Sequence, residues 1–278
     1  MMNAIQRMQA AVPSVRGESN PHPGAQGARL FSTIQDIYEL LPFGRQARSG
    51  GQTETALQFR HRRAKAGQAV YRMGQAFDVL YIVRLGFLKT VIRSVDGDAR
   101  VLSFPAKGDF LGFDGIYRNR YATDAIALTD CELVALPFKQ LLTMAHSYRD
   151  LEQMIYLAIS RELAPGRPES LAGAIRAEAR VARFLEKQAD SYASLGYSPR
   201  NFLLPMSRRD IGSYLGLSLE TVSRSLSAMA SAGVIAIERR HVQILKPELL
   251  HLFRHMHPLP KAKSRHRPRE IELAEAGQ

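Results

Sequence analysis

The sequence predicts an α+β fold in which an all-β barrel or jelly roll precedes helices and a helix-turn-helix. Three observations lead to this prediction. Between Leu57 and Phe138, short β-prone runs alternate with glycines, as in small barrels and jelly rolls. From Lys139 onward, apolar residues recur at helical spacing instead. Between Ser207 and Gly233, two short segments that begin with capping residues flank a glycine turn, which is the pattern of a helix-turn-helix.

The β-prone region divides into separate strands at its glycines. We expect strands at Val79–Arg84, Phe87–Ile92, Ala99–Phe104, Ala125–Leu128 and Glu132–Leu136. The Asp96-Gly97 pair favours a tight hairpin, because both residue types tolerate the positive φ that such turns need. Before the strands, residues 1–30 have the composition of a flexible extension, and Phe31–Leu41 suggests a short helix. The first folded domain is therefore expected over residues 31–146.

Two helical stripes follow, over residues 147–195. The first contains Leu151, Met154, Ile155 and Ala158, and the second contains Leu171, Ala174, Ile175, Val181, Ala182 and Leu185. An apolar stripe on a helix after a β-domain fits either a core or a dimer seam. The segment Pro165–Pro168 separates the stripes, and because proline removes a helical hydrogen bond, we expect a break or kink there.

The helix-turn-helix belongs to a domain expected over residues 196–250. Ser207 is placed to cap the first helix, with Asp210 at capping-box spacing. Gly216 permits the turn, Ser218 caps the second helix, and Gly233 suits its C-terminal end. The β-prone runs 234–237 and 242–245 then predict a hairpin wing with a basic tip. Residues 251–278 have the composition of a basic tail.

The second helix has an apolar face and a polar face. The apolar face, which would pack on the first helix, carries Val222, Leu226 and Met229. The polar face carries groups suited to base edges, namely Glu220, Ser223, Arg224 and Ser227. Arginine can bind guanine O6 and N7, glutamate can accept from cytosine N4, and serine can do either. The residues that we assign to the DNA backbone are Ser207, Arg208, Arg209, Ser218, Thr221, Ser227 and Arg240.

The composition favours a polyanionic partner. The chain has 278 residues and a net charge of +12, which is typical of proteins that meet nucleic acid or an anionic membrane surface, although such charge also serves solubility. No run of about 18 apolar residues and no secretory signal occurs, which predicts a cytoplasmic protein without a membrane partner. The chain has no glycine-rich phosphate loop, H-E-x-x-H or G-x-S-x-G motif, so we expect no enzyme.

Several segments resemble the Crp/Fnr superfamily of bacterial regulators, in particular its Fnr/FixK-like branch. They are RRDIGSYLGLSLETVSRSL, the preceding GYSPRNFLLPMS, the spaced glycines Gly67, Gly74 and Gly86, and KGDFLGFDGI, and the likeness spans roughly residues 57–250. The resemblance implies an N-terminal β-roll like cyclic-nucleotide-binding domains, a long dimerisation helix, which we assign to residues 147–195, and a C-terminal winged helix-turn-helix. It further implies a homodimer that binds palindromic double-stranded DNA and contacts RNA polymerase.

The family reads DNA through the motif E-x-x-S-R, whose positions match Glu220, Ser223 and Arg224. Ser223 is informative, because the Crp branch usually has glycine at that position. The Fnr-like triplet implies a half-site resembling TTGAT, and we therefore expect an inverted repeat resembling TTGAT-N4-ATCAA.

The resemblance does not identify the signal that the β-roll of this chain would sense. Cyclic-nucleotide members use a Gly-Glu pair and an Arg-Ser pair, whereas this chain has Gly112-Phe113 and Tyr121-Ala122 at those places. Arg118 and Arg120 are close enough to substitute, but we expect loop charges there and do not expect cAMP to bind. The single cysteine, Cys131, excludes a four-cysteine iron–sulfur cluster by count, and we expect it to be a buried structural thiol, with a redox role open if it is exposed.

Because the resemblance does not identify a ligand or signal, two rival functions are considered. One is an effector-gated regulator that needs haem, a nucleotide or another small molecule in the β-roll, with His61 and His146 as candidate haem ligands that we expect at the surface. The other is a cupin-type enzyme with an accessory helix-turn-helix, which would need clustered metal ligands on the strands. The histidines His251, His255 and His257 could bind a metal, but a polar helix end explains them better. A regulator without any ligand also remains open.

Overall fold

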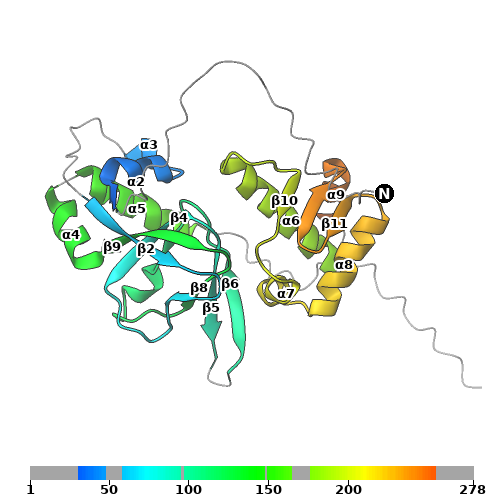
Figure 1. The fold of residues 1–278 in the computed structure, drawn as a ribbon, viewed down its shortest axis with the longest axis horizontal. Coiled ribbons are helices and arrows are strands. Elements are labelled where there is room, and N and C mark those ends of the chain that lie inside the picture. The colour runs from blue at the N-terminus through cyan, green and yellow to red at the C-terminus, as the bar shows by residue number, and fades with distance from the viewer. Residues whose placement is uncertain (1–30, 48–57, 95–96, 148, 165–175, 255–278) are drawn as a thin grey trace, which may run out of the picture. The chain divides into compact units, whose positions relative to one another are not determined.

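The first described domain is a β-roll of two antiparallel sheets, whose strands run in colour from blue at β1 through cyan to green in Figure 1. The structure is a computed structural model that describes residues 31–47, 58–94, 97–147, 149–164 and 176–254. One sheet contains, in spatial order, β1 (Phe31–Thr33), β2 (Gln58–Ala64), β9 (Cys131–Pro137), β4 (Val79–Leu85) and β7 (Phe110–Leu111). The other contains β3 (Ala69–Tyr71), β8 (Asp124–Ala127), β5 (Leu88–Arg93) and β6 (Ala99–Ser103). The predicted jelly roll is confirmed.

The five strands predicted from the sequence are all present, and each observed end lies within one residue of the predicted end. The predicted hairpin joins β5 to β6, which pair in antiparallel register with Arg93 opposite Ala99. Gly97 adopts a φ of 86°, and its N–H donates to the Ser94 carbonyl at 3.1 Å. The sequence did not single out β2, because its residues QFRHRRA are mostly charged and show no clean apolar alternation.

The segment before β2 is part strand and part helix. The prediction of a helix over Phe31–Leu41 is therefore corrected, because Phe31–Thr33 pairs with β2 as strand β1 and α2 starts only at Ile34 (α2, Ile34–Leu40; α3, Gly44–Ala47). Thr33 marks the change, since its backbone is extended and its side chain accepts from the Asp36 N–H in a capping box.

Two helices follow the β-roll, namely α4 (Phe138–Ser147) and α5 (Arg149–Leu163). The first predicted stripe lies on α5, and its four apolar residues are all buried. They share one hydrophobic cluster with α2, α4 and the strands β2, β4 and β9. The predicted break at Pro165–Pro168 lies outside the described residues.

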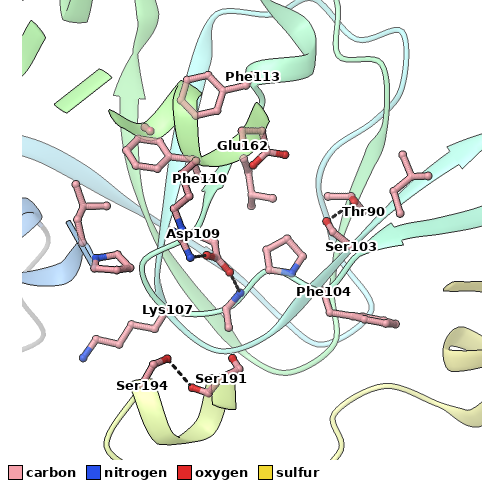
Figure 2. A pocket seen from close by; sticks show the side chains of 18 of the residues that line it. Thr90, Ser103, Phe104, Lys107, Asp109, Phe110, Phe113, Glu162, Ser191 and Ser194 are labelled. Atoms are coloured by element: carbon pink, nitrogen blue, oxygen red, sulfur yellow. Dashed lines mark hydrogen bonds and ion pairs between the residues drawn. The ribbon is translucent and has the colours of Figure 1, made fainter. Parts of the chain in front are cut away.

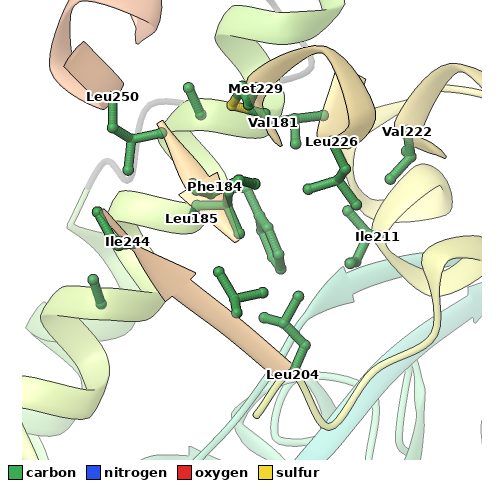
Figure 3. Packing of buried hydrophobic residues seen from close by; sticks show 14 of the residues in the cluster. Val181, Phe184, Leu185, Leu204, Ile211, Val222, Leu226, Met229, Ile244 and Leu250 are labelled. Atoms are coloured by element: carbon green, nitrogen blue, oxygen red, sulfur yellow. The ribbon is translucent and has the colours of Figure 1, made fainter. Parts of the chain in front are cut away.

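The C-terminal part forms a winged helix-turn-helix around its own core (Figure 3). Its elements are α6 (Ala177–Ser194), β10 (Asn201–Leu203), α7 (Arg208–Leu215), α8 (Leu219–Ser231), β11 (Ile235–Glu238), β12 (His241–Ile244) and α9 (Pro247–Arg254). The predicted wing is the β11–β12 hairpin. Strand β10 pairs with β12. One expectation is corrected: the supposed tail from residue 251 begins inside α9, whose Leu250 is buried.

The apolar face of α6 packs within the helix-turn-helix. We had assigned residues 147–195 to dimerisation, but Val181, Phe184 and Leu185 lie in the same cluster as Ile211 and Leu226 (Figure 3). These three side chains are completely buried inside the chain, so they are not available to a second subunit. Helix α6 therefore belongs structurally with α7 and α8. Within the described ranges, every helix is too short or too polar to cross a lipid bilayer.

Candidate nucleic-acid interface

Helix α7 starts at a capping box, as the sequence predicted. The Ser207 hydroxyl accepts from the Asp210 N–H at 3.1 Å, and the Asp210 carboxylate accepts from the Ser207 N–H at 3.0 Å. The same carboxylate also accepts the Ser207 hydroxyl proton at 2.7 Å. Because each residue satisfies the free N–H of the other, the first turn of α7 is held in one conformation. The cap thus fixes where Arg208 and Arg209 leave the helix.

Two glycines shape the turn between α7 and α8. Gly216 ends α7 in the left-handed conformation, with a φ of 65°, and its N–H donates to the Gly212 carbonyl. Gly212 itself is approached closely, because a Cβ there would lie 2.6 Å from the Leu217 carbonyl oxygen. Gly216 was predicted as the turn glycine, whereas the close approach at Gly212 was not predicted. The available signal was a glycine inside an otherwise helical pattern, which often marks a close backbone approach.

The variant Gly212→Ala is expected to destabilise the helix-turn-helix by about 1–3 kcal/mol, because the added methyl group overlaps backbone that cannot rotate away. The better helix propensity of alanine, worth about 1 kcal/mol, offsets only part of this strain. Chemical denaturation followed by circular dichroism measures the loss. Ser231→Ala at the exposed end of α8 is the control and should stay within about 0.5 kcal/mol of the parent. An unchanged midpoint for Gly212→Ala would show that the turn relaxes freely.

Helix α8 separates its two faces as predicted. Ser218 caps it by accepting from the Thr221 N–H at 3.1 Å. The predicted apolar residues Val222, Leu226 and Met229 are all buried in the core. On the other face, Glu220, Arg224 and Ser227 are exposed and Ser223 is half-buried. Helix α8 therefore presents a polar surface on a rigid support, which suits an element that enters a DNA groove.

The carboxylate of Glu220 is stabilised in its charged form. Its own backbone N–H and then the Ser218 hydroxyl lower the pKa of this exposed carboxyl below its usual range, and the nearby Arg224 and Arg209 act in the same direction. Glu220 is therefore ionised at neutral pH and keeps its charge to a lower pH than an ordinary glutamate does. An ionised carboxylate only accepts hydrogen bonds, as recognition of a cytosine amino group requires.

The two arginines at the start of α7 are placed differently. Arg209 is exposed, as expected for a residue that meets phosphates. Arg208 is half-buried, and its Nη1 donates to the Ser223 hydroxyl oxygen at 3.3 Å. Its guanidinium therefore lies against the recognition helix and touches a residue of the predicted base-reading triplet. This contact could not be predicted from the sequence, because it joins residues on two helices.

The wing tip carries two further arginines. Arg239 is exposed and adopts a φ of 54°, which is uncommon for a residue other than glycine. Arg240 is also exposed, and its Nη1 donates to the Pro205 carbonyl at 3.1 Å. This bond ties the tip to the segment just before α7. The guanidinium of Arg240, which we assigned to the DNA backbone, thus already has a hydrogen-bond partner within the protein.

Comparisons with known proteins agree with this arrangement. The Crp-like helix-turn-helix domain family matches residues 179–253, and the cyclic nucleotide-binding domain family matches residues 61–148. The transcriptional regulatory protein btr of Bordetella pertussis is 35% identical over 66% of this chain and 76% of its own length. The chain belongs to the Crp/Fnr family of transcriptional regulators.

Other Crp/Fnr proteins support the same conclusion. The fumarate nitrate reduction regulatory protein of Klebsiella oxytoca is 32% identical over 66% of this chain and 74% of its own. The structure of FixK2 from Bradyrhizobium japonicum superimposes with a TM-score of 0.65 at 25% identity, covering 73% of this chain and all of that one. The helix-turn-helix match begins within α6, in keeping with the packing of that helix.

The β-roll departs from a cyclic-nucleotide site. At the expected ribose place, Phe113 lies in a short 3₁₀ turn (η1, Phe113–Gly115), with its ring 5.3 Å from that of Phe110 (Figure 2). At the expected phosphate place, the Asp114 carboxylate accepts from the Ala122 N–H at 3.0 Å and the Thr123 hydroxyl at 2.8 Å. The donors that could hold a phosphate are therefore occupied by the chain's own carboxylate.

The two arginines that could have substituted at this place are both exposed. Arg120 donates to the Gly74 carbonyl at 2.7 Å. Arg118 lies in the same exposed segment before Tyr121. These positions fit the prediction of loop charges rather than a phosphate site.

The candidate haem ligand His61 is placed differently from our expectation of a surface residue. Its side chain is only 3% exposed, with Nε2 2.7 Å from the Ser32 hydroxyl and Nδ1 2.9 Å from the Glu132 carboxylate. Both ring nitrogens thus face protein groups, and neither is directed toward an external ligand. His146, near the end of α4, is exposed. Among the described residues, no three potential metal ligands come together, so the cupin-type rival finds no support there.

Cys131 is buried, as expected. Its Sγ lies 3.3 Å from the Phe87 carbonyl oxygen and 3.2 Å from that of Thr129. Burial raises the pKa of this thiol above its ordinary value, so the reactive thiolate is disfavoured at neutral pH. These contacts describe a structural thiol.

Proposed function

We propose that this regulator binds an inverted repeat resembling TTGAT-N4-ATCAA as a homodimer, and that Glu220, Ser223 and Arg224 read each half-site. The observation that carries the proposal is the outward placement of these three side chains on α8, whose opposite face is buried. Arg224 would bind a guanine through its fork, and the ionised Glu220 would accept from a cytosine amino group.

Contacts to the DNA backbone would position the two helices without adding sequence information. Caps and charges at the starts of α7 and α8 are suited to phosphates, because helix N-termini favour anions. The residues assigned to this role from the sequence are Ser207, Arg208, Arg209, Ser218, Thr221, Ser227 and Arg240, and for Arg208 the bond to Ser223 takes the place of a phosphate contact. The structure modifies the expectation for two of them, since Arg208 and Arg240 already donate to protein oxygens.

Helix α5 is the proposed dimer seam. Glu152, Tyr156, Ile159 and Leu163 follow one another at spacings of four, three and four residues, which places them along one stripe, as in a coiled coil. Tyr156 is 63% and Leu163 is 76% exposed, although both are large and apolar in character. The buried residues of α5 point to a different side, and Ile159 is half-buried against the same cluster. The exposed side chains of Tyr156 and Leu163 are therefore the part of this stripe that we propose meets a second copy.

Family membership also supports a contact between the DNA-bound dimer and RNA polymerase, and a cytoplasmic location beside promoter DNA. We propose further that DNA binding requires no cyclic nucleotide, because Asp114 fills the place of the phosphate.

The test is binding of the purified protein, in air and without effector, to the TTGAT-N4-ATCAA duplex and to a scrambled duplex. A preference of about a thousandfold supports the proposal. Weak and equal binding would favour the effector-gated alternative or another half-site.

Alanine at Glu220 or Arg224 is expected to weaken binding to the inverted repeat by about 1–3 kcal/mol and to relax specificity at one base pair. The scrambled duplex should show little change, because base contacts contribute only at the correct sequence. Competition binding against duplexes with single base-pair changes measures the effect. Arg209→Ala is the matched control, for which we expect a similar loss on every duplex. Equal losses on specific and scrambled DNA for Arg224→Ala would refute its role in base reading.

A further inference from the structure

The contact between Arg208 and Ser223 links the first helix of the motif to the base-reading face of the second. Arg208 is the first residue of α7, directly after the capping box of Ser207 and Asp210. Its Nη1 reaches the Ser223 hydroxyl oxygen at 3.3 Å. Since the cap holds the backbone at the base of this side chain, the guanidinium is anchored at one end and bonded at the other.

The chemistry of the pair determines the direction of the hydrogen bond. A guanidinium carries only donors and stays protonated at every physiological pH. Ser223 Oγ must therefore be the acceptor. A serine hydroxyl has one proton to donate, and beside a cation that proton turns away from the positive charge. The proton of Ser223 is thus left for a group on another side of the hydroxyl.

The neighbouring buried serine of α8 shows the contrast. Ser225 donates its hydroxyl proton to the Thr221 carbonyl at 2.9 Å, the usual local bond of a serine within a helix. Ser225 is buried, whereas Ser223 is half-buried on the side of Glu220 and Arg224. The Arg208 bond therefore favours a Ser223 hydroxyl that acts as a donor at the polar face of α8.

We propose that Arg208 is a specificity-determining positioning residue, which holds the Ser223 hydroxyl as a hydrogen-bond donor toward the base edges. This inference rests on the proposed function, in which α8 enters the major groove. A free serine can serve donor or acceptor bases alike, whereas a serine held as donor selects an acceptor such as thymine O4 or purine N7 and rejects the cytosine amino group. Arg208 thereby acts on sequence selection without itself touching a base.

The adjacent arginine is the natural comparison. Arg209 is exposed, and its charge is among those that lower the pKa of Glu220, so it lies on the same surface. The two neighbouring arginines thus differ in their exposure and in the bond to Ser223. If both were phosphate contacts, their removal would have the same consequences.

The experiment measures base preference in four variants of the full chain: Arg208→Met, Arg209→Met, Ser223→Ala, and the double variant Arg208→Met/Ser223→Ala. Methionine retains an unbranched apolar side chain for packing, and circular dichroism verifies folding of each variant. Preferred sites are first selected from a random duplex library with the parent protein, so that an incorrect half-site does not block the test. Affinity is then measured for every single base-pair change at two salt concentrations. Ser223→Ala identifies the base pair at which Ser223 acts.

We expect Arg208→Met to reduce the base preference at that same base pair by about fivefold, which corresponds to the loss of one hydrogen bond. The base preference at the other positions should not change. The double variant should show no further loss of preference beyond Ser223→Ala. Arg209→Met should lower all affinities alike and reduce the slope of log affinity against log salt by about one.

Two results would overturn the inference. One is a uniform loss for Arg208→Met with a reduced salt slope, which would make Arg208 a phosphate contact. The other is an unchanged preference at every position for Ser223→Ala. Either result leaves the proposed function standing if Glu220→Ala and Arg224→Ala still alter specificity. If the parent protein selects no sequence from the library, the proposed function itself fails.

Discussion

Replacing Leu163 with glutamate is expected to convert the dimer into a monomer and to weaken binding to a full inverted repeat by about 100- to 10,000-fold. The reason is that two linked DNA-binding domains bind a full repeat more tightly than one domain does, by a factor of this size. Leu163 is 76% exposed in the single chain, so the substitution should leave the fold of each subunit intact. At the seam, however, two carboxylates would face each other. Analytical ultracentrifugation measures the oligomeric state, and titration with a full repeat and a single half-site measures the affinities.

The matched control is Leu142→Glu on α4, which introduces the same charge at another exposed leucine outside the α5 stripe. We expect this variant to remain a dimer and to bind the repeat like the parent. Binding of Leu163→Glu to a single half-site should also stay close to the parent value. A dimeric Leu163→Glu variant with full affinity would place the subunit contact elsewhere.

Phe184→Ala is expected to destabilise the DNA-binding domain by about 3–5 kcal/mol, as for other completely buried phenylalanines. Phe184 lies on α6 with no exposed surface and packs in the cluster that includes Leu226 of the recognition helix. A loss of this size approaches the total stability of many domains. Hydrogen exchange resolved by peptide should show faster exchange in α7 and α8, and DNA binding should fall with the folded fraction.

The control for this variant is Tyr117→Ala, which removes an aromatic ring that is 90% exposed and should change stability by less than about 0.5 kcal/mol. The oligomeric state of Phe184→Ala distinguishes the two assignments of α6. A variant that loses dimerisation while α7 and α8 keep their protection would return α6 to the dimer interface. Retained dimerisation with an unfolded helix-turn-helix supports the packing described above.

The helix-turn-helix could be predicted almost completely, because its signals are local. Ser207, Ser218 and Gly216 each act within one turn of backbone, and the split of α8 into two faces follows from the helical repeat alone. The structure confirms the caps, the turn and the buried residues at the predicted positions. The hairpin at Gly97 was predictable for the same reason.

The remaining features depend on contacts between distant segments. The apolar stripe of α6 indicated that one face is buried, but it contained no information on what covers that face. His61 was expected at the surface, and only the pairing of β1 with β2 and of β2 with β9 encloses it between Ser32 and Glu132. The bond from Arg208 to Ser223 likewise needs the relative placement of α7 and α8.

The carboxylate of Asp114 opposes the binding of another anion at the same donors of the β-roll. Because it is joined by the chain to the groups it contacts, it competes for the Ala122 N–H and the Thr123 hydroxyl as an intramolecular ligand. Such a tethered group has an effective concentration of about millimolar or more. A free phosphate ester would have to outcompete it and also overcome the repulsion between two negative charges. A cyclic nucleotide would therefore bind at this place at a higher cost in free energy than in a domain whose corresponding donors are free.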